Sequence, residues 1–288
     1  MERLWNKEVE QRFFKESTQF ATPEQLFYVT DRGQYLAYWP KGYDGIKSTL
    51  QSRNALIGNF TEKWTTDLIH EIVKDKGLFA VQGAICNEIA LSNQSPADVI
   101  ISRSKNINQT PEDILAIIEV KMSIVWNWEL QKNKLICIGD YKTHQGNPGL
   151  LRSDSMLKAI GKSINIRVSS SKASKIPIII MGNTPITNSY YSKVDHLKSA
   201  GIIQSFWSVN PKPLDNDGEN IKKTDKQGFY RFDSFIELKN AFANLLSEER
   251  NYFSSMKSKK GLGQIIEKAN KEQTYEKKAE VFLKLINE

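Results

Sequence analysis

Three charged residues stand at the ends of two apolar runs that are expected to form buried strands. Asp98 opens the run ADVIIS, and Glu119 and Lys121 interrupt the end of ILAIIEVKM. Residues i and i+2 of a strand point to the same face, so Glu119 and Lys121 should share a face. An unpaired buried carboxylate or ammonium is costly, so these charges need partners. If the two strands pair, Asp98 supplies a second carboxylate.

Such a cluster has an obvious chemistry. Two carboxylates, Asp98 and Glu119, together with the backbone carbonyl of Val120, would form an oxygen-rich site for a hard divalent cation, and Mg²⁺ fits best. A bound Mg²⁺ lowers the pKa of its water and polarises a phosphoryl oxygen. Lys121, beside the metal, could orient or help deprotonate that water and stabilise charge on a pentavalent phosphorane.

The residues Pro96-Ala97-Asp98, a polar loop and then Glu119-Val120-Lys121 resemble the PD-(D/E)XK nuclease superfamily. Within it, the chain is most like a type II restriction endonuclease. One departure is that Ala97 separates the proline from the aspartate. The resemblance implies that Asp98 and Glu119 ligate the metal and that Lys121 positions or activates the attacking water.

The resemblance also implies a glutamate on a helix that precedes the first strand of the core. Residues 59–76 are predicted to form that helix, with Asn59 as its N-cap and Gly77 as its end. Glu62 is the favoured candidate, although an acid at this position also suits a capping box. Glu71, on an apolar face of the same helix, is the alternative.

A second group of residues is suited to DNA. A Gly/Pro-containing loop leads into a helix predicted over 150–168, and lysines and helix N-termini suit phosphate oxygens. Polar side chains in the loop could read base edges. The loop 31–48 has four aromatic residues mixed with basic ones. These aromatic side chains could stack on bases, or they could pack within the loop itself. The candidates for DNA contact are Lys41, His144, Gln145, Asn147, Arg152, Ser153, Lys158 and Lys162.

The composition narrows the alternatives. The net charge of +7 and pI near 9.1 favour a polyanionic partner. No apolar run is long enough to span a membrane, and the N-terminus is too charged for a secretory signal, so we expect a cytoplasmic protein with no membrane partner. Two cysteines and three scattered histidines argue against zinc. Motifs for nucleotide cofactors or serine hydrolases are missing from the sequence.

The order of elements predicts an α/β fold with a mixed central β-sheet flanked by helices, and extra N- and C-terminal helices. The resemblance implies that this fold is a restriction-endonuclease-like core. We expect one nuclease domain over 1–288, with an N-terminal arm (1–54), a catalytic core (55–210) and a loop with C-terminal helices (211–288). Strands are predicted at 78–85, 97–102, 114–122, 134–140, 176–183 and 204–210, and further helices at 192–203 and within 1–30 and the last 55 or so residues.

These observations together predict a Mg²⁺-dependent type II restriction endonuclease that acts on double-stranded DNA as a homodimer, because two sites related by a twofold axis cut both strands of a palindrome. Two alternatives remain open. One is a structure-specific or repair nuclease such as a junction resolvase. The other is a DNA-binding protein that has this fold without catalysis.

Overall fold

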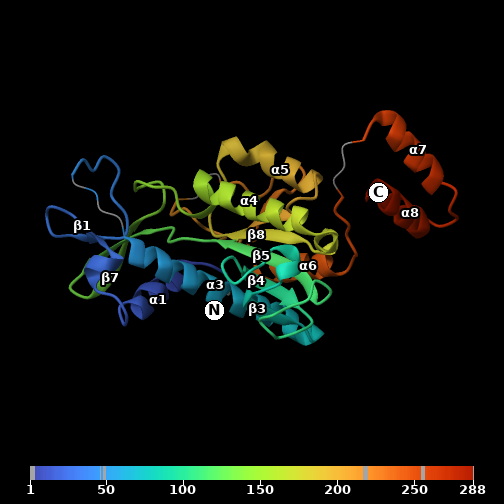
Figure 1. Ribbon diagram of the computed structural model, residues 1–288. Coiled ribbons are helices and arrows are strands. Elements are labelled where there is room, and N and C mark those ends of the chain that lie inside the picture. The colour runs from blue at the N-terminus through green and yellow to red at the C-terminus, as the bar shows by residue number, and fades with distance from the viewer. Residues whose placement is uncertain (1–3, 46, 48–49, 217–219, 254–256, 288) are drawn as a thin grey trace. The chain divides into compact units, whose positions relative to one another are not determined.

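The computed structural model describes residues 4–45, 47, 50–216, 220–253 and 257–287. Its centre is a six-stranded mixed sheet in the order β10-β9-β8-β5-β4-β3 (Figure 1). Within this sheet β3, β4 and β5 form an antiparallel meander, and β8, β9 and β10 run parallel to β5. The strands are β3 (Phe79–Ala84), β4 (Ala97–Ser102), β5 (Ile114–Lys121), β8 (Ile178–Gly182), β9 (Ser205–Ser208) and β10 (Phe229–Arg231).

Helices cover both faces of this sheet (Figure 1). One core contains the inward side chains of three helices, α1 (Lys7–Ser17), α3 (Gln51–Val73) and α6 (Phe235–Leu246). The other contains those of α4 (Ser153–Ser169) and α5 (Tyr191–Ser199). All five residues of β8 are buried, as expected for a parallel strand covered on both sides. The predicted α/β class with a mixed central sheet and flanking helices is therefore confirmed.

A smaller antiparallel sheet, in the order β1-β2-β6-β7, lies outside the central one. The strand predicted at 134–140 is present as β7 (Lys134–Gly139), but it pairs with β6 in this small sheet and does not extend the central one. Its strands are β1 (Tyr28–Val29), β2 (Tyr35–Leu36), β6 (Asn127–Gln131) and β7 (Lys134–Gly139), and the short helix α2 (Pro23–Leu26) precedes it. Single 3₁₀ segments lie at Lys74–Lys76, Asn87–Ile89, Gly149–Leu151, Ser171–Lys175 and Asn188–Tyr190.

The long helix starts earlier than its sequence indicates. The predicted N-cap, Asn59, is wrong: α3 begins at Gln51, so Asn59 lies inside the helix. The predicted end is correct, because a 3₁₀ turn follows Val73 and Gly77 then adopts a left-handed backbone with φ of 67°. As a consequence, Glu62 is in the middle of a helix and has no capping role.

The chain divides into two compact units, residues 1–249 and 250–288. The second contains α7 (Lys259–Ala269) and α8 (Tyr275–Asn287), with Phe253 edge-on to Phe282 at 5.5 Å between ring centroids. The range 211–288, expected as one addition to the core, is thus divided: β10 and α6 belong to the first unit. Among the described residues, no helix combines the length and apolar character needed to cross a bilayer.

Candidate active site

The pairing of β4 with β5 brings the two predicted carboxylates together. Val99 lies opposite Ile118 in the antiparallel register, so one further step along both strands places Asp98 beside Glu119. The pairing extends through the Asp98 side chain, whose Oδ2 accepts a hydrogen bond of 2.7 Å from the backbone N–H of Val120. Asp98 is therefore fixed directly against the strand that carries Glu119.

Lys121 joins these two carboxylates on the same face of the sheet. Its Nζ lies 2.6 Å from Oε1 of Glu119 and 3.6 Å from Oδ2 of Asp98. It also donates to the carbonyl oxygen of Val120 at 3.1 Å. The Val120 side chain points to the opposite face, into the core that contains α3. The alternation predicted for Glu119-Val120-Lys121 is present.

Lys162, predicted only as a DNA contact, reaches into this cluster from α4. Its Nζ lies 2.6 Å from Oε2 of Glu119 and 3.2 Å from Oδ1 of Asp98, and it donates to the carbonyl oxygen of Pro96 at 2.8 Å. Burial works to lower the pKa of Lys162, but the attraction of Glu119 and Asp98 outweighs it and raises the pKa. The ammonium is therefore charged at neutral pH.

A signal in the sequence could have placed Lys162. On a helix, residues three or four apart lie on one face. Lys162 stands between Ala159 and Ile166 in this spacing, and both are buried in the core that α4 forms with the sheet. The ammonium of a lysine on such a buried face must either pair with a carboxylate or extend to solvent, because an unpaired charge is rarely buried in the core.

The structure separates the two candidate helix glutamates. Glu62 is half-buried and accepts a 3.2 Å hydrogen bond from Nε2 of Gln82 on β3. Burial, and then repulsion from Asp98, raise the pKa of Glu62. Glu71 instead pairs with Lys74 at 2.7 Å on a more open part of the helix. Of the two glutamates, Glu62 is therefore the one whose pKa Asp98 affects, and it stays the favoured candidate.

The cluster offers oxygen atoms in a pattern that suits a small hard cation. Asp98 and Glu119 provide carboxylates, and the carbonyl oxygens of Pro96 and Val120 already contact ammonium groups. Within the part of the chain that the structure describes, no three His, Cys, Asp or Glu side chains group closely enough to hold a metal alone. Mg²⁺ needs no such cage, since one or two carboxylates, water and substrate phosphate oxygens usually bind it. The donor set therefore fits Mg²⁺.

Two residues predicted to read bases are engaged within the protein. The His144 ring is buried and stacks on Tyr38 at 3.9 Å between centroids, with its nitrogens 3.1 and 3.3 Å from the carbonyl oxygens of Gln145 and Val125. Burial lowers the pKa of His144. Gln145 donates to the carbonyl oxygens of Pro40 and Tyr43, both at 3.0 Å. The hydrogen bonds of Gln145 therefore tie its loop to the loop that contains Pro40 and Tyr43, and neither side chain is free to read a base.

The aromatics of the loop 31–48 also pack within the protein. Trp39 stacks on Tyr28 at 4.7 Å and on Tyr43 at 4.4 Å. The packing interpretation of this loop is therefore the one that the contacts support. The remaining DNA candidates have exposed side chains, and Lys158 and Arg152 each pair with Asp154, at 3.1 and 3.6 Å. These exposed candidates are Lys41, Asn147, Arg152, Ser153 and Lys158.

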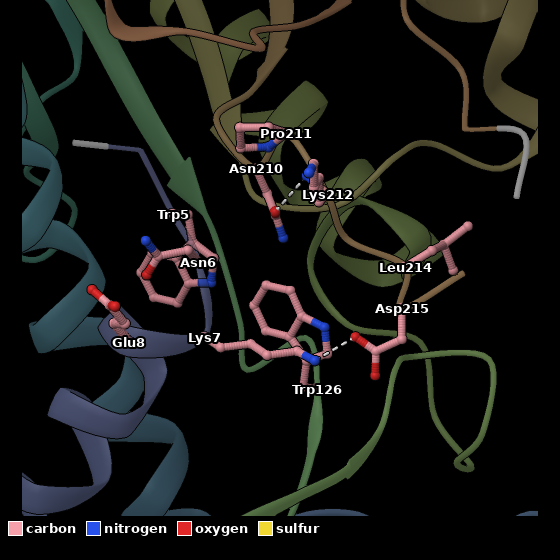
Figure 2. Close-up of a pocket in the computed structure, with 10 residues that line it drawn as sticks. All are labelled: Trp5, Asn6, Lys7, Glu8, Trp126, Asn210, Pro211, Lys212, Leu214 and Asp215. Carbon is pink, nitrogen blue, oxygen red and sulfur yellow. Dashed lines mark hydrogen bonds and ion pairs between the residues drawn. The ribbon is translucent and has the colours of Figure 1, made fainter. Parts of the chain in front are cut away.

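A separate pocket of about 340 Å³ lies near the point where the chain leaves β9 (Figure 2). Trp5, Trp126 and Asn210 line it, and Lys7 closes one side through an ion pair of 2.5 Å with Asp215. Trp5 belongs to the core on the α3 face, whereas the carboxylate cluster faces α4. The pocket is therefore distinct from the cluster.

Comparison of the chain with models of known protein families, with curated proteins and with solved structures finds no match.

Proposed function

We propose that the protein is a Mg²⁺-dependent endonuclease that hydrolyses phosphodiester bonds of double-stranded DNA. One observation carries this proposal: Asp98, Glu119 and Lys121, which are distant in sequence, form a single cluster at the adjoining ends of β4 and β5. The same residues carry the resemblance to the PD-(D/E)XK nucleases.

Each residue of the cluster has a distinct task in this proposal. Asp98, Glu119 and the carbonyl of Val120 would hold the cation, whose chemistry is to activate water and polarise a phosphoryl oxygen. The Lys121 ammonium, held by Glu119, would orient the attacking water and stabilise negative charge on the phosphorane. Glu62 would complete the site from α3 through a water.

The charge of the whole chain supports DNA as the substrate. The net charge is +7, and the basic residues Arg152 and Lys158 are exposed on or beside the helix that carries Lys162. Lysine and arginine neutralise phosphates and release counterions. Among DNA endonucleases, we propose a type II restriction enzyme that acts as a homodimer, because paired sites would cut both strands of a palindrome.

Plasmid cleavage tests this proposal. Supercoiled plasmid incubated with the protein should give discrete linear fragments with Mg²⁺ and remain intact with EDTA. A plasmid that is retarded in the gel but uncut in Mg²⁺ would reject catalysis and leave a DNA-binding protein. Preferential cutting of branched over linear DNA would reject the restriction assignment in favour of a structure-specific nuclease.

A further inference from the structure

Lys162 occupies the space between the two carboxylates that would hold the metal. We infer that Lys162 is a tethered cation: it holds Asp98 and Glu119 together in the metal-free protein, and the entering divalent ion displaces it. This inference rests on the proposed cation site and assigns Lys162 a positioning role that is different from contact with DNA.

The contacts around the two lysines divide the carboxylate oxygens between them. Lys162 is paired with Oδ1 of Asp98 and Oε2 of Glu119, whereas Lys121 is paired with Oδ2 of Asp98 and Oε1 of Glu119. Each carboxylate thus has one oxygen against each ammonium. A metal ion that takes an oxygen from both carboxylates must therefore replace contacts to at least one lysine.

Lys162 is the lysine with freedom to withdraw. Lys121 belongs to β5 itself, two residues from Glu119, and also contacts the carbonyl of Val120. Lys162 comes from α4, a different element, at the end of four flexible methylenes. Placing a divalent ion beside two ammoniums creates strong like-charge repulsion, and rotation of the Lys162 side chain relieves it.

Its charge also explains how the carboxylates lie together before metal binds. Asp98 and Glu119 are mostly covered, with side chains 16% and 7% exposed, so water screens their repulsion poorly. Two ammoniums balance the two negative charges. Without Lys162, one negative charge stays uncompensated. The metal-free protein should then be less stable, and its affinity for a divalent cation should be higher.

The test compares Lys162→Met with Lys158→Met, a matched control that removes a lysine one turn away on the same helix. Lys158 is 73% exposed and its partner, Asp154, lies outside the cluster. Isothermal titration of the DNA-free, full-length protein with MgCl₂ measures affinity, and thermal unfolding in EDTA and in Mg²⁺ measures stability. Lys162→Met should bind Mg²⁺ about tenfold more tightly, the effect of removing one charge-assisted competing contact. Its melting temperature should fall in EDTA and recover in Mg²⁺. Lys158→Met should match wild type in Mg²⁺ affinity and melting temperature, the two DNA-free measurements, which its proposed contact with DNA does not enter.

Three outcomes decide the matter. Equal or weaker Mg²⁺ binding by Lys162→Met would overturn the inference, since a residue with a merely structural role would not tighten binding when removed. If that variant does not fold, Lys162→Gln carries the same expectation, because its amide is neutral and polar. Asp98→Asn serves to test the cation site itself: if it binds Mg²⁺ as wild type does, the proposed function fails together with the inference. Loss of binding in Asp98→Asn with unchanged binding in Lys162→Met would reject the role of Lys162 alone.

Discussion

The oxygens of Asp98 and Glu119 are the atoms on which the proposed chemistry depends. Exchanging either acid for its amide keeps the shape of the side chain and removes the charge that would hold the metal. Asp98→Asn and Glu119→Gln should therefore give no detectable plasmid cleavage in Mg²⁺ while still retarding DNA in a gel. Lys121→Met should slow cleavage by about 10²–10⁴-fold, the usual contribution of a positioned acid–base group. Wild-type rates in Asp98→Asn or Glu119→Gln would remove that residue from the site.

Glu62 and Glu71 offer a matched pair on one helix. Glu62 is coupled to Asp98 and bonded to Gln82, whereas Glu71 is paired with Lys74. Glu62→Gln should slow cleavage by about tenfold or more, as loss of an outer-shell partner of a metal site commonly does. Glu71→Gln should cleave at the wild-type rate. Single-turnover cleavage rates of the two variants decide between the two residues. If Glu71→Gln is slow and Glu62→Gln cleaves at the wild-type rate, Glu71 is the helix carboxylate of the site.

At the scale of elements, the buried carboxylate of Glu10 on α1 holds the segment that follows β5. Oε1 of Glu10 accepts hydrogen bonds from the Val125 N–H at 2.6 Å and the Trp5 indole at 3.0 Å. Oε2 accepts from the Trp126 N–H at 3.2 Å and the Trp128 indole at 2.8 Å. Because Val125 lies shortly after Lys121 in the chain, Glu10 helps to define where β5 ends.

This connection makes stability depend on pH. Burial raises the pKa of Glu10 from 4.5 to about 7, although its four hydrogen bonds act in the other direction. The folded protein therefore holds this proton more tightly than the unfolded chain. The resulting stabilisation is complete below about pH 4.5 and is lost as the pH rises to about 7, which amounts to about 3 kcal/mol.

The measurement is the free energy of urea unfolding between pH 5 and 8 for wild type and Glu10→Gln. His144 acts in the opposite sense, because burial lowers its pKa and stability from this group falls as the pH falls. The difference between the two proteins isolates Glu10: the wild type should lose more stability than the variant as pH rises. Parallel curves would show that Glu10 has the same proton affinity in both states.

The sequence predicts the strands of the site better than the elements that surround them. β4 has the predicted bounds, because a run such as ADVIIS can be stable only when both faces are covered. The predicted start of α3 is wrong because Asn59 followed by Glu62 matches the pattern of a helix N-terminus. The helix instead continues back through Gly58 and Asn54, whose weak helix propensity packing overrides. The strands β6 and β10 were missed, since short polar or aromatic segments become strands only through their partners.

Within the site, the sequence was informative wherever residues were close along one strand. Glu119 and Lys121 follow from the alternation of a strand, and Asp98 follows if β4 pairs with β5. Lys162 was only partly predictable: its spacing from Ala159 and Ile166 places it on the buried face of α4. Which carboxylates it reaches depends on how α4 crosses the sheet, and local spacing does not determine that. For the same reason, His144 and Gln145 looked available for bases although tertiary hydrogen bonds occupy both.

At the scale of the whole molecule, the positive charge is unevenly distributed. Residues 250–288 contain nine lysines and arginines and five acids, so this unit carries +4 of the total of +7. The other 249 residues carry only +3. Since phosphate contacts by Lys and Arg dominate sequence-independent affinity for DNA, the C-terminal unit should supply a large share of it.

Neutralising part of this charge tests that expectation without shortening the chain. The substituted lysines are all exposed, and changing them to glutamine brings the net charge of the unit from +4 to zero: Lys259, Lys260, Lys271 and Lys277. DNA binding, followed by fluorescence anisotropy across a series of salt concentrations, should weaken. The slope of log affinity against log salt should become shallower by about 0.9 for each DNA phosphate that the variant no longer neutralises.

A control variant separates direct binding from overall charge. It changes four exposed lysines of the first unit to glutamine: Lys105, Lys132, Lys134 and Lys226. Both variants have the same reduction in net charge, so a long-range field alone would weaken binding by a similar amount in each. Direct binding of DNA by the C-terminal unit predicts a shallower salt slope only for the first variant, with its Mg²⁺ affinity unchanged because Asp98 and Glu119 are untouched. Equal slopes for the two variants would exclude the C-terminal unit as a DNA-binding surface.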